Sequence, residues 1–495
     1  MRAWLQEWKR RLRPDRARVP VFYDEPYRLP FARLDAHHGL EPRQVDFTTG
    51  YLLEAGIVRA TDIHRPRPVS YAQLARVHDA AYLESLEAPE TLASIFAVEP
   101  SVVPVDTVLD TVRRICGGTL EAARLALCTR RPAVNMAGGF HHAAPDHGGG
   151  FCVLNDIAVA ITTLRQEGFG GSVAVLDLDA HPSDGTAACL SGDPHVWVGS
   201  LSGSDWGLVP GADEVLLARG CGDAEYLAAL EALLERMPRA ELAFVIAGGD
   251  VLRGDRFGLL GLSLKGARRR DLAVARALHR VPSVWLPGGG YHAEAWKVFV
   301  GSVLVLDERG HEPIQERFDP RGMLARHPSP LKALERQQAW EAITLEDLEG
   351  ALGYADPGRP RLLGHYTEQS LEYALFRSGV GPSLERLGYG PPRVSVDVSA
   401  AGERLQLLGH AHGREHVLMD CVLSRQRVEG ADVLFVDKLL LPQPRAAASP
   451  PVEEGEGARE VLEMLRFMAQ RLGLRGVFFP PAESSLPGAP QARCG

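Results

Sequence analysis

The run Val-Leu-Asp-Leu-Asp-Ala-His-Pro-Ser-Asp-Gly, residues 175–185, joins an apolar segment to a dense group of titratable side chains. The apolar residues 173–176 predict a buried strand, and open α/β sheets bind ligands beyond the carboxyl ends of their strands. Four polar side chains crowd this end: Asp177, Asp179, His181 and Asp184. Buried charge is costly without a metal, a partner or water. The plainer alternative is a helix capped by Asp184 with the other groups at the surface.

Asp179 and His181 alternate along an extended segment, so both side chains can point to the same side. A carboxylate oxygen and an imidazole nitrogen suit Zn²⁺, Mn²⁺ or Fe²⁺. Asp250 follows another apolar run and would complete an Asp/His/Asp set. Three protein ligands with an open fourth position are typical of catalytic rather than structural zinc sites.

Outward from this segment, short apolar runs alternate with helical patterns. Strands are predicted at Val134–Ala137, Val173–Leu178, Leu242–Ala247 and Val281–Leu286. Helices are predicted at Ile157–Gln166, Asp223–Arg236 and Gly266–His279. This alternation predicts an α/β fold in which helices wrap a parallel sheet. All four strands lead into polar or glycine-rich loops, which should gather at one edge of the sheet.

Two adjacent histidines, His141 and His142, follow the first of these strands. Adjacent histidines at a strand end need two separate polar partners, and two carboxylates of the segment already described could serve, Asp177 and Asp184. A carboxylate bonded to an imidazole fixes the tautomer of the ring and tunes its basicity.

Two glycine-rich loops add aromatic side chains to the same edge. Residues 148–151 end in Phe151, and residues 287–291 end in Tyr291. Glycine has no Cβ, so the backbone there can approach a ligand closely. Phe151 is expected to line an apolar channel, and Tyr291 to swing its hydroxyl over the metal.

Together these segments resemble the histone deacetylase superfamily, in particular bacterial-type lysine deacetylases. The resemblance is carried, in the family's order, by Gly139–His142, Gly150–Asp156, Asp177–Gly185, Gly249–Asp250 with Gly254–Asp255, and Gly288–Tyr291. It covers residues 20–310 and implies the three-layer arginase/deacetylase fold. Each motif alone is weak, but the set is highly specific.

The resemblance also implies residue roles. It implies Zn²⁺ held by Asp179, His181 and Asp250, with Fe²⁺ as the open alternative, and a structural K⁺ near Asp177. Catalytic roles fall on His141 paired with Asp177, on His142 paired with Asp184, and on Tyr291. Gly150, Phe151 and Gly289 would contact the substrate. In the implied mechanism His142 removes a proton from water, and the metal and Tyr291 stabilise the oxyanion.

The segment opposite Phe151 departs from the family pattern. Many relatives carry an aromatic residue within the stretch that corresponds to 201–210, where Val209 is the best-placed residue here and Trp206 lies nearby. A wider tunnel is therefore expected, and the length of the acyl group stays open. Arg253 is expected to pair with Asp255, although attraction of an anionic substrate group is an alternative.

Composition excludes some classes of function. The chain has 495 residues, 45% hydrophobic, and a formal net charge of -9, so it is not an electrostatic binder of nucleic acid. Its seven cysteines form no C-x-x-C pair and are typical of reduced thiols in a cytoplasmic protein. No apolar run is long enough to span a bilayer.

We expect four segments. Residues 1–20 are basic and form either a lipid- or acid-binding amphipathic helix or a helix docked by its tryptophans. Residues 21–310 form the catalytic domain, and residues 311–345 a connector with a helix at Leu331–Ile343. Residues 346–495 form a smaller α+β accessory domain with a run of antiparallel strands. An acyltransferase role for it is disfavoured, because three glutamates at 453–456 would repel a pyrophosphate.

The leading hypothesis is a zinc-dependent deacylase acting on acyl-lysine in proteins. Deacetylation of acetylpolyamines or other small cationic amides is the alternative within the same chemistry. A two-manganese ureohydrolase is disfavoured, because no second Asp-x-Asp motif lies near Asp250 and the two histidines would be unexplained. A catalytically silent acyl-lysine binder is the remaining alternative. The oligomeric state stays open.

Overall fold

A computed structural model describes residues 19–30, 41, 43–314, 318–326, 368–378, 393–399, 402–411, 414–428, 431–440, 456–471, 474–475 and 477–478. The chain folds into two compact units. One comprises Met1–Val69 and Gln73–Gly350, and the other Ser70–Ala72 and Ala351–Gly495. The expected basic segment up to residue 18 and the expected helix at 331–343 lie outside the described residues.

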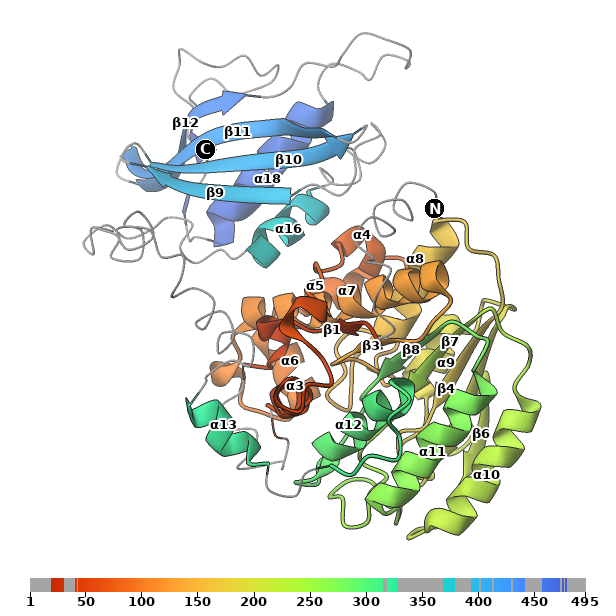
Figure 1. Cartoon of the computed structure of the whole chain (residues 1–495). Helices are drawn as coiled ribbons and strands as arrows, with labels where there is room; N and C mark the ends of the chain where they lie inside the picture. Colours follow the sequence, from red (N-terminus) through yellow and green to blue (C-terminus); the bar gives the residue numbers. More distant parts are fainter. Residues whose placement is uncertain are drawn as a thin grey trace. The chain divides into compact units, whose positions relative to one another are not determined.

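The first unit is built on a parallel sheet of eight strands (Figure 1). In spatial order they are β2 (Ile63–His64), β1 (Val21–Phe22), β3 (Ala133–Asn135), β8 (Ser283–Leu286), β7 (Leu242–Ile246), β4 (Val173–Asp177), β5 (Val196–Ser202) and β6 (Ala212–Leu216). The predicted parallel α/β fold is confirmed. All four predicted strands are present, and they form the centre of the sheet in the order β3-β8-β7-β4.

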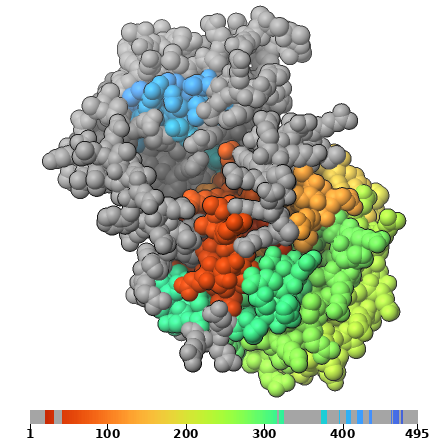
Figure 2. All heavy atoms as spheres, in the orientation of Figure 1, coloured from red at the N-terminus to blue at the C-terminus, as the bar shows by residue number. Residues whose placement is uncertain are grey.

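Helices cover both faces of this sheet. One run of packed neighbours is α10 (Asp223–Arg236), α11 (Leu264–Ala277), α12 (Ala295–Leu306) and α3 (Gln44–Glu54). The other is α7 (Val105–Thr129), α8 (Asp156–Gln166) and α9 (Asp184–Leu190). Shorter helices are α4 (Tyr71–Leu74), α5 (Ala80–Ser85), α6 (Pro89–Phe96), α13 (Pro320–Arg326) and the single 3₁₀ turns η1 (Glu25–Tyr27), η2 (Ala60–Asp62) and η3 (Pro100–Val102). Figure 2 shows the surface where α3, in orange-red, meets the green α12 and α13.

Local sequence explains where two of the long helices begin. The Asn155 side chain accepts a hydrogen bond from the amide of Ala158 at the start of α8. Ser263 caps α11 in the same way, with its hydroxyl 2.9 Å from the amide nitrogen of Gly266. Such caps satisfy amides that have no partner within the helix. The cap residues therefore fix where each βα loop ends.

The central strands are buried on both sides. Every residue of β4 and β7 is buried, because helices cover both faces of the sheet. Since all eight strands are parallel, the segments that follow β3, β4, β7 and β8 emerge at the same edge. This edge carries every residue for which the sequence predicts a catalytic or metal-binding role.

The second unit contains a five-stranded sheet and two helices. Strands β9 (Arg393–Ser399), β10 (Gly402–Ala411), β11 (Arg414–Val428) and β12 (Ala431–Leu440) pair antiparallel in chain order, and β13 (Val477–Phe478) adds to β12 in parallel. Helix α18 (Glu456–Arg471) contributes buried Met464, Leu465 and Met468 to a core shared with the strands. The predicted strand run is present, whereas α16 (Glu368–Arg377) was not predicted. Among the described residues of either unit, no helix is both long and apolar enough to cross a bilayer.

Candidate metal centre and active site

Asp179, His181 and Asp250 converge at the carboxyl ends of β4 and β7. Each offers one ligand atom, and these atoms lie within 4.8 Å of one another. The Nδ1 atom of His181 is 3.1 Å from the Oδ1 atom of Asp179 and 3.0 Å from the Oδ2 atom of Asp250. Both carboxylates are fully buried, so the three groups form a compact, largely enclosed donor set.

The electrostatics of this set favour a bound cation. Burial and the neighbouring Asp179 carboxylate raise the pKa of Asp250. Burial opposes charge on His181, but its hydrogen bonds to the two carboxylates outweigh burial and raise its pKa to about 11. Two buried carboxylates that repel each other and together attract positive charge are the environment that a divalent ion relieves. Two oxygen donors and one imidazole nitrogen fit Zn²⁺ or Fe²⁺.

Glycine leaves room beside these ligands. A Cβ atom built on Gly289 would lie 2.9 Å from Oδ2 of Asp179 and 3.0 Å from Oδ2 of Asp250. Any side chain at this position would therefore press against both carboxylates. The glycine-rich loop after β8 keeps open the space in which an ion and a substrate oxygen would have to fit.

The two adjacent histidines each have their own carboxylate. Nδ1 of His141 is 2.7 Å from Oδ2 of Asp177, and Nδ1 of His142 is 2.7 Å from Oδ1 of Asp184. The two ring centroids are 4.0 Å apart. Because each carboxylate bonds Nδ1, the Nε2 nitrogen lies on the opposite side of each ring, and both histidines line the cavity described below.

Different surroundings separate the two imidazoles in acidity. Burial opposes charge on His141, but the Asp177 and Asp179 carboxylates outweigh it and raise its pKa to about 9. Burial and the neighbouring His141 lower the pKa of His142. The lowered pKa of His142 favours its neutral form, which can accept a proton, and the raised pKa of His141 favours its charged form, with a proton on both ring nitrogens. A pair of titratable groups driven apart in this way is typical of acid–base catalysis.

Buried side chains behind the histidines hold their loop in place. The Asp156 carboxylate accepts hydrogen bonds from the amides of Gly139 and Phe140 and from the hydroxyl of Thr119. Asn155 donates from Nδ2 to the carbonyl of Ala143. Sequence reasoning assigned no role to these residues. The available signal was their place in the Gly150–Asp156 motif.

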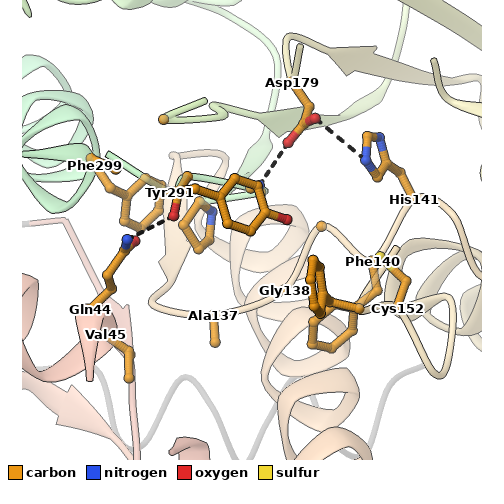
Figure 3. Close-up of a pocket in the computed structure, with 18 of the residues that line it drawn as sticks. Gln44, Val45, Ala137, Gly138, Phe140, His141, Cys152, Asp179, Tyr291 and Phe299 are labelled. Carbon is orange, nitrogen blue, oxygen red and sulfur yellow. Dashed lines mark hydrogen bonds and ion pairs between the residues drawn. The ribbon is translucent and has the colours of Figure 1, made fainter. Parts of the chain in front are cut away.

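One cavity of about 310 Å³ connects these groups. Four aromatic side chains line it near the metal-binding residues: Phe151, Trp206, Phe257 and Tyr291. Trp206 is 54% exposed and Phe257 37%, so this end is open to solvent. The buried residues Ile115, Met136 and Phe299 also line the cavity. Figure 3 shows Asp179, His141 and Tyr291 facing this cavity.

The structure corrects the expected wall opposite Phe151. Val209 is buried and is not among the residues that line the cavity, whereas Trp206 is. The Trp206 ring centroid is 4.9 Å from that of His142 and 5.9 Å from that of His181. A turn closed by the Asp205 carboxylate and the amide of Gly207 presents the indole to the site. The expected loss of an aromatic wall was wrong, because this turn brings Trp206 to the cavity.

The other predicted substrate-contacting residues line the cavity. Gly150, Phe151 and Gly289 all do so. Gly150 has a φ of 53°, and a Cβ atom there would lie 2.4 Å from Cδ2 of His142, so a side chain would displace that ring. The Phe151 ring centroid lies 5.7 Å from that of Tyr291.

The expected Arg253–Asp255 pair was wrong. Oδ1 of Asp255 accepts from the amides of Phe257 and Gly258, and Oδ2 from the amide of Tyr291. Within the described chain Arg253 is exposed and forms no ion pair with this carboxylate. Backbone amides already satisfy the carboxylate.

Ser200 lies where the resemblance implies a structural K⁺, near Asp177. It lies opposite Asp177 in the pairing of β5 with β4 and is fully buried. Its Oγ atom has no hydrogen-bond partner among the described residues. A buried oxygen without a partner is costly. A coordinated cation would satisfy it, so the residues around Asp177 fit K⁺.

Comparison with known proteins adds independent findings. The model of the histone deacetylase domain matches residues 38–305. The chain is 31% identical over 310 residues to histone deacetylase 2 of Arabidopsis thaliana, which covers 59% of this chain and 80% of that protein. It is 33% identical over 291 residues to an uncharacterised protein of Picosynechococcus, covering 55% of this chain and 92% of that protein.

A solved structure supports the fold. The crystal structure of an HDAC homologue from Aquifex aeolicus matches with a TM-score of 0.51 and 24% identity, over 63% of this chain and 89% of that one. At this identity the likeness concerns the fold alone, and it agrees with the eight-stranded parallel sheet. Together with the domain match over more than half of its length, this shows that the chain belongs to the histone deacetylase family, whose membership supports deacetylase activity.

Proposed function

We propose that this protein is a zinc-dependent amide hydrolase that removes acetyl or other acyl groups from lysine side chains. The observation that carries the proposal is the convergence of three elements on one cavity. These are the Asp179/His181/Asp250 donor set, two histidine–carboxylate pairs and Tyr291. Three protein ligands with room for a further one are the arrangement of a catalytic rather than a structural metal.

Zn²⁺ bound to this set would polarise the scissile carbonyl and increase the acidity of a water molecule. His142, kept neutral by burial, removes the proton of the attacking water. His141, which retains its proton, stabilises negative charge beside it. Tyr291 donates a hydrogen bond to the oxyanion, since burial raises the pKa of its hydroxyl well above the ordinary value. The leaving amine then receives the proton that His142 accepted.

The open end of the cavity suits the methylene chain of lysine. Phe151, Trp206 and Phe257 present aromatic surfaces there, and apolar surface is what a chain of four methylenes needs for burial. The backbone carbonyl of Gly150 would accept from the substrate amide N–H. The part of the cavity that buried Ile115 and Met136 line would receive the acyl group.

The same surroundings disfavour acetylpolyamines. Two carboxylates occur among the described residues that line the cavity, Glu41 and Asp179. Asp179 belongs to the metal set, and Glu41 pairs with Arg321 at 3.0 Å. The distal ammonium groups of a polyamine would therefore gain cation–π contacts with the aromatic rings at the open end but no ion pair with a carboxylate that lines the cavity. An acyl-lysine side chain in a peptide has no distal ammonium group and needs no such carboxylate.

Two further assignments belong to this proposal. K⁺ held beside Asp177 and Ser200 would neutralise the carboxylate that supports His141 and would stabilise the end of β4. Residues Ala351–Gly495 of the second unit lie outside the matched residues 38–305, and we propose that residues 346–495 act as an accessory domain without catalytic residues.

Hydrolysis of acetyl-, butyryl- and longer acyl-lysine peptides tests the proposal, with N-acetylated polyamines assayed in parallel. Asp179→Ala and Tyr291→Phe serve as matched variants. Turnover of the peptides that collapses in both variants and requires added Zn²⁺ after chelation is the expected result. If only the polyamines are hydrolysed, the substrates are small amides rather than acyl-lysine in proteins. Peptide binding without any turnover would leave only a binding role.

A further inference from the structure

Side chains from three separate segments form hydrogen bonds to the backbone of the loop Gly288–Tyr291. The amide of Gly289 donates to Oδ2 of Asp179 at 2.6 Å. The carbonyl of Gly290 accepts from Nε2 of Gln44 at 2.7 Å, and the amide of Tyr291 donates to Oδ2 of Asp255 at 2.7 Å. Figure 3 shows the bond of Gln44 on one side of the loop and a bond of Asp179 on the other. The loop therefore differs from the freely swinging one expected of a glycine run.

Gln44 reaches this loop from a distant part of the chain. It is the first residue of α3, and its side chain lines the cavity. Its helix is anchored one turn later, where the hydroxyl of Thr48 bonds the carbonyls of Gln44 and Trp296. Trp296 lies in α12, which begins directly after the loop. The amide group of Gln44 thus comes from a support that is tied to the chain just beyond Tyr291.

Asp255 holds the other side of the loop. One oxygen bonds the amides of Phe257 and Gly258 at 3.0 and 3.1 Å, and the other bonds Tyr291. An ionised carboxylate only accepts hydrogen bonds, which matches its three N–H partners. The turn that it closes also places the Phe257 ring edge-on to Tyr291, with centroids 4.7 Å apart. Asp255 therefore restrains both the backbone and the ring of Tyr291.

We infer that Gln44 and Asp255 are positioning residues that fix the Tyr291 hydroxyl for oxyanion stabilisation. The inference rests on the proposed amide-hydrolase function. Three glycines precede Tyr291, and glycine itself constrains the backbone little. The position of the hydroxyl must therefore be set from outside the loop. Because a misplacement of about 1 Å can cost about 10²-fold in rate, the two bonds act on catalysis through Tyr291.

A double-mutant cycle tests this coupling. Gln44→Met keeps the length of the side chain but removes its N–H donor. We expect it to lower kcat about tenfold with KM changed by less than about twofold, since the oxyanion exists only after substrate has bound. In the Tyr291→Phe background the same change should have no further effect, because the hydroxyl that Gln44 positions is already absent. Effects that multiply in the double variant would overturn the inference.

Asp255→Asn provides the second arm. Its Oδ1 can still close the turn at Phe257 and Gly258, while its amide faces the N–H of Tyr291 and cannot accept from it. Thr49→Val is the matched control on α3, because Thr49 bonds only the carbonyl of Val45 in its own helix and does not line the cavity. This control should retain wild-type kcat.

Hydrogen exchange of the peptide that covers residues 287–292 gives a readout that is independent of activity. Exchange of the Tyr291 amide should accelerate at least about tenfold in Asp255→Asn and remain at the wild-type rate in Thr49→Val. Unchanged exchange in Asp255→Asn would overturn the inference even in a protein without turnover. If wild type does not hydrolyse acyl-lysine, the proposed function fails. If wild type and Tyr291→Phe hydrolyse it equally, the role of Tyr291 in oxyanion stabilisation fails, and the positioning role with it. If Tyr291→Phe is impaired and the cycle is additive, only the positioning role fails.

Discussion

Protonation of His78 should destabilise the first unit at mildly acidic pH. This imidazole is 2% exposed and joins the segment after His142 to the start of α8. Nδ1 is 2.9 Å from the carbonyl of Ala144, and Nε2 accepts from the amide of Asn155 at 3.1 Å. Only the neutral ring satisfies both contacts, donating from Nδ1 and accepting at Nε2. A second proton would abolish the bond to Asn155, the residue that caps α8.

The magnitude follows from the pKa. Burial lowers the pKa of His78 from 6.5 to about 4. The native state therefore binds fewer protons than the unfolded state between these values, and stability falls as the pH is lowered. The contribution is complete above pH 6.5 and lost below about pH 4, and it totals about 3 kcal/mol. Between pH 7 and pH 5 the free energy of unfolding should fall by about 2 kcal/mol through this group.

Urea unfolding followed by tryptophan fluorescence measures this effect. The described tryptophans, Trp197, Trp206, Trp285 and Trp296, lie in the first unit, so the signal reports that unit. His78→Gln should lose about 1–3 kcal/mol at pH 7, because one buried contact is broken. Its free energy of unfolding should then depend less on pH than that of wild type, by about 2 kcal/mol between pH 7 and pH 5. Equal pH dependence in both proteins would refute the reasoning.

Three further predictions concern the site. Tyr291→Phe should lower kcat about 10²–10³-fold, which is the effect of losing one oxyanion donor, and should leave the melting temperature unchanged. Steady-state kinetics on proteins with the same metal content measures this. A kcat within about twofold of wild type would contradict the prediction. Gly289→Ala should abolish zinc binding, because the added methyl group would lie 2.9 Å from Oδ2 of Asp179. Elemental analysis measures the bound zinc. The control Gly192→Ala, whose methyl group has no atom within 4 Å, should bind zinc normally. Trp206→Ala should raise KM for acyl-lysine peptides about fivefold, because the indole no longer contacts the methylene chain. Val209→Ala should leave KM unchanged. Equal KM values for the two variants would contradict the assignment of Trp206 to the cavity wall.

Much of the site could be predicted from the sequence because its determinants are local. Asp179 and His181 alternate directly after a strand, so their convergence needs only the geometry of that strand. Asp250 and Tyr291 follow neighbouring parallel strands, whose carboxyl ends share one edge. The resemblance to known deacetylases added the pairing of His141 with Asp177 and of His142 with Asp184. The structure has both pairs at hydrogen-bonding distance.

Weak local signals account for what the sequence missed in the fold. Strands β1 and β2 contain two residues each, too few for a periodic pattern. Strand β6 has no fully buried residue, so its sequence lacks the apolar run of a central strand. Strand pairing within the sheet, rather than composition, makes these segments extended.

By itself, the sequence determined the four central strands of the sheet, three of its helices, and the residues proposed as the metal donor set and the catalytic histidines. Each of these depends on residues close together in the chain or on strands that end at the same edge. Tertiary structure alone decided that Trp206 rather than Val209 forms the wall, and that Gln44 and Asp255 hold the loop of Tyr291. The physical reason is that a turn's direction and a contact between residues 44 and 290 depend on packing. Such packing leaves no periodic pattern in the sequence.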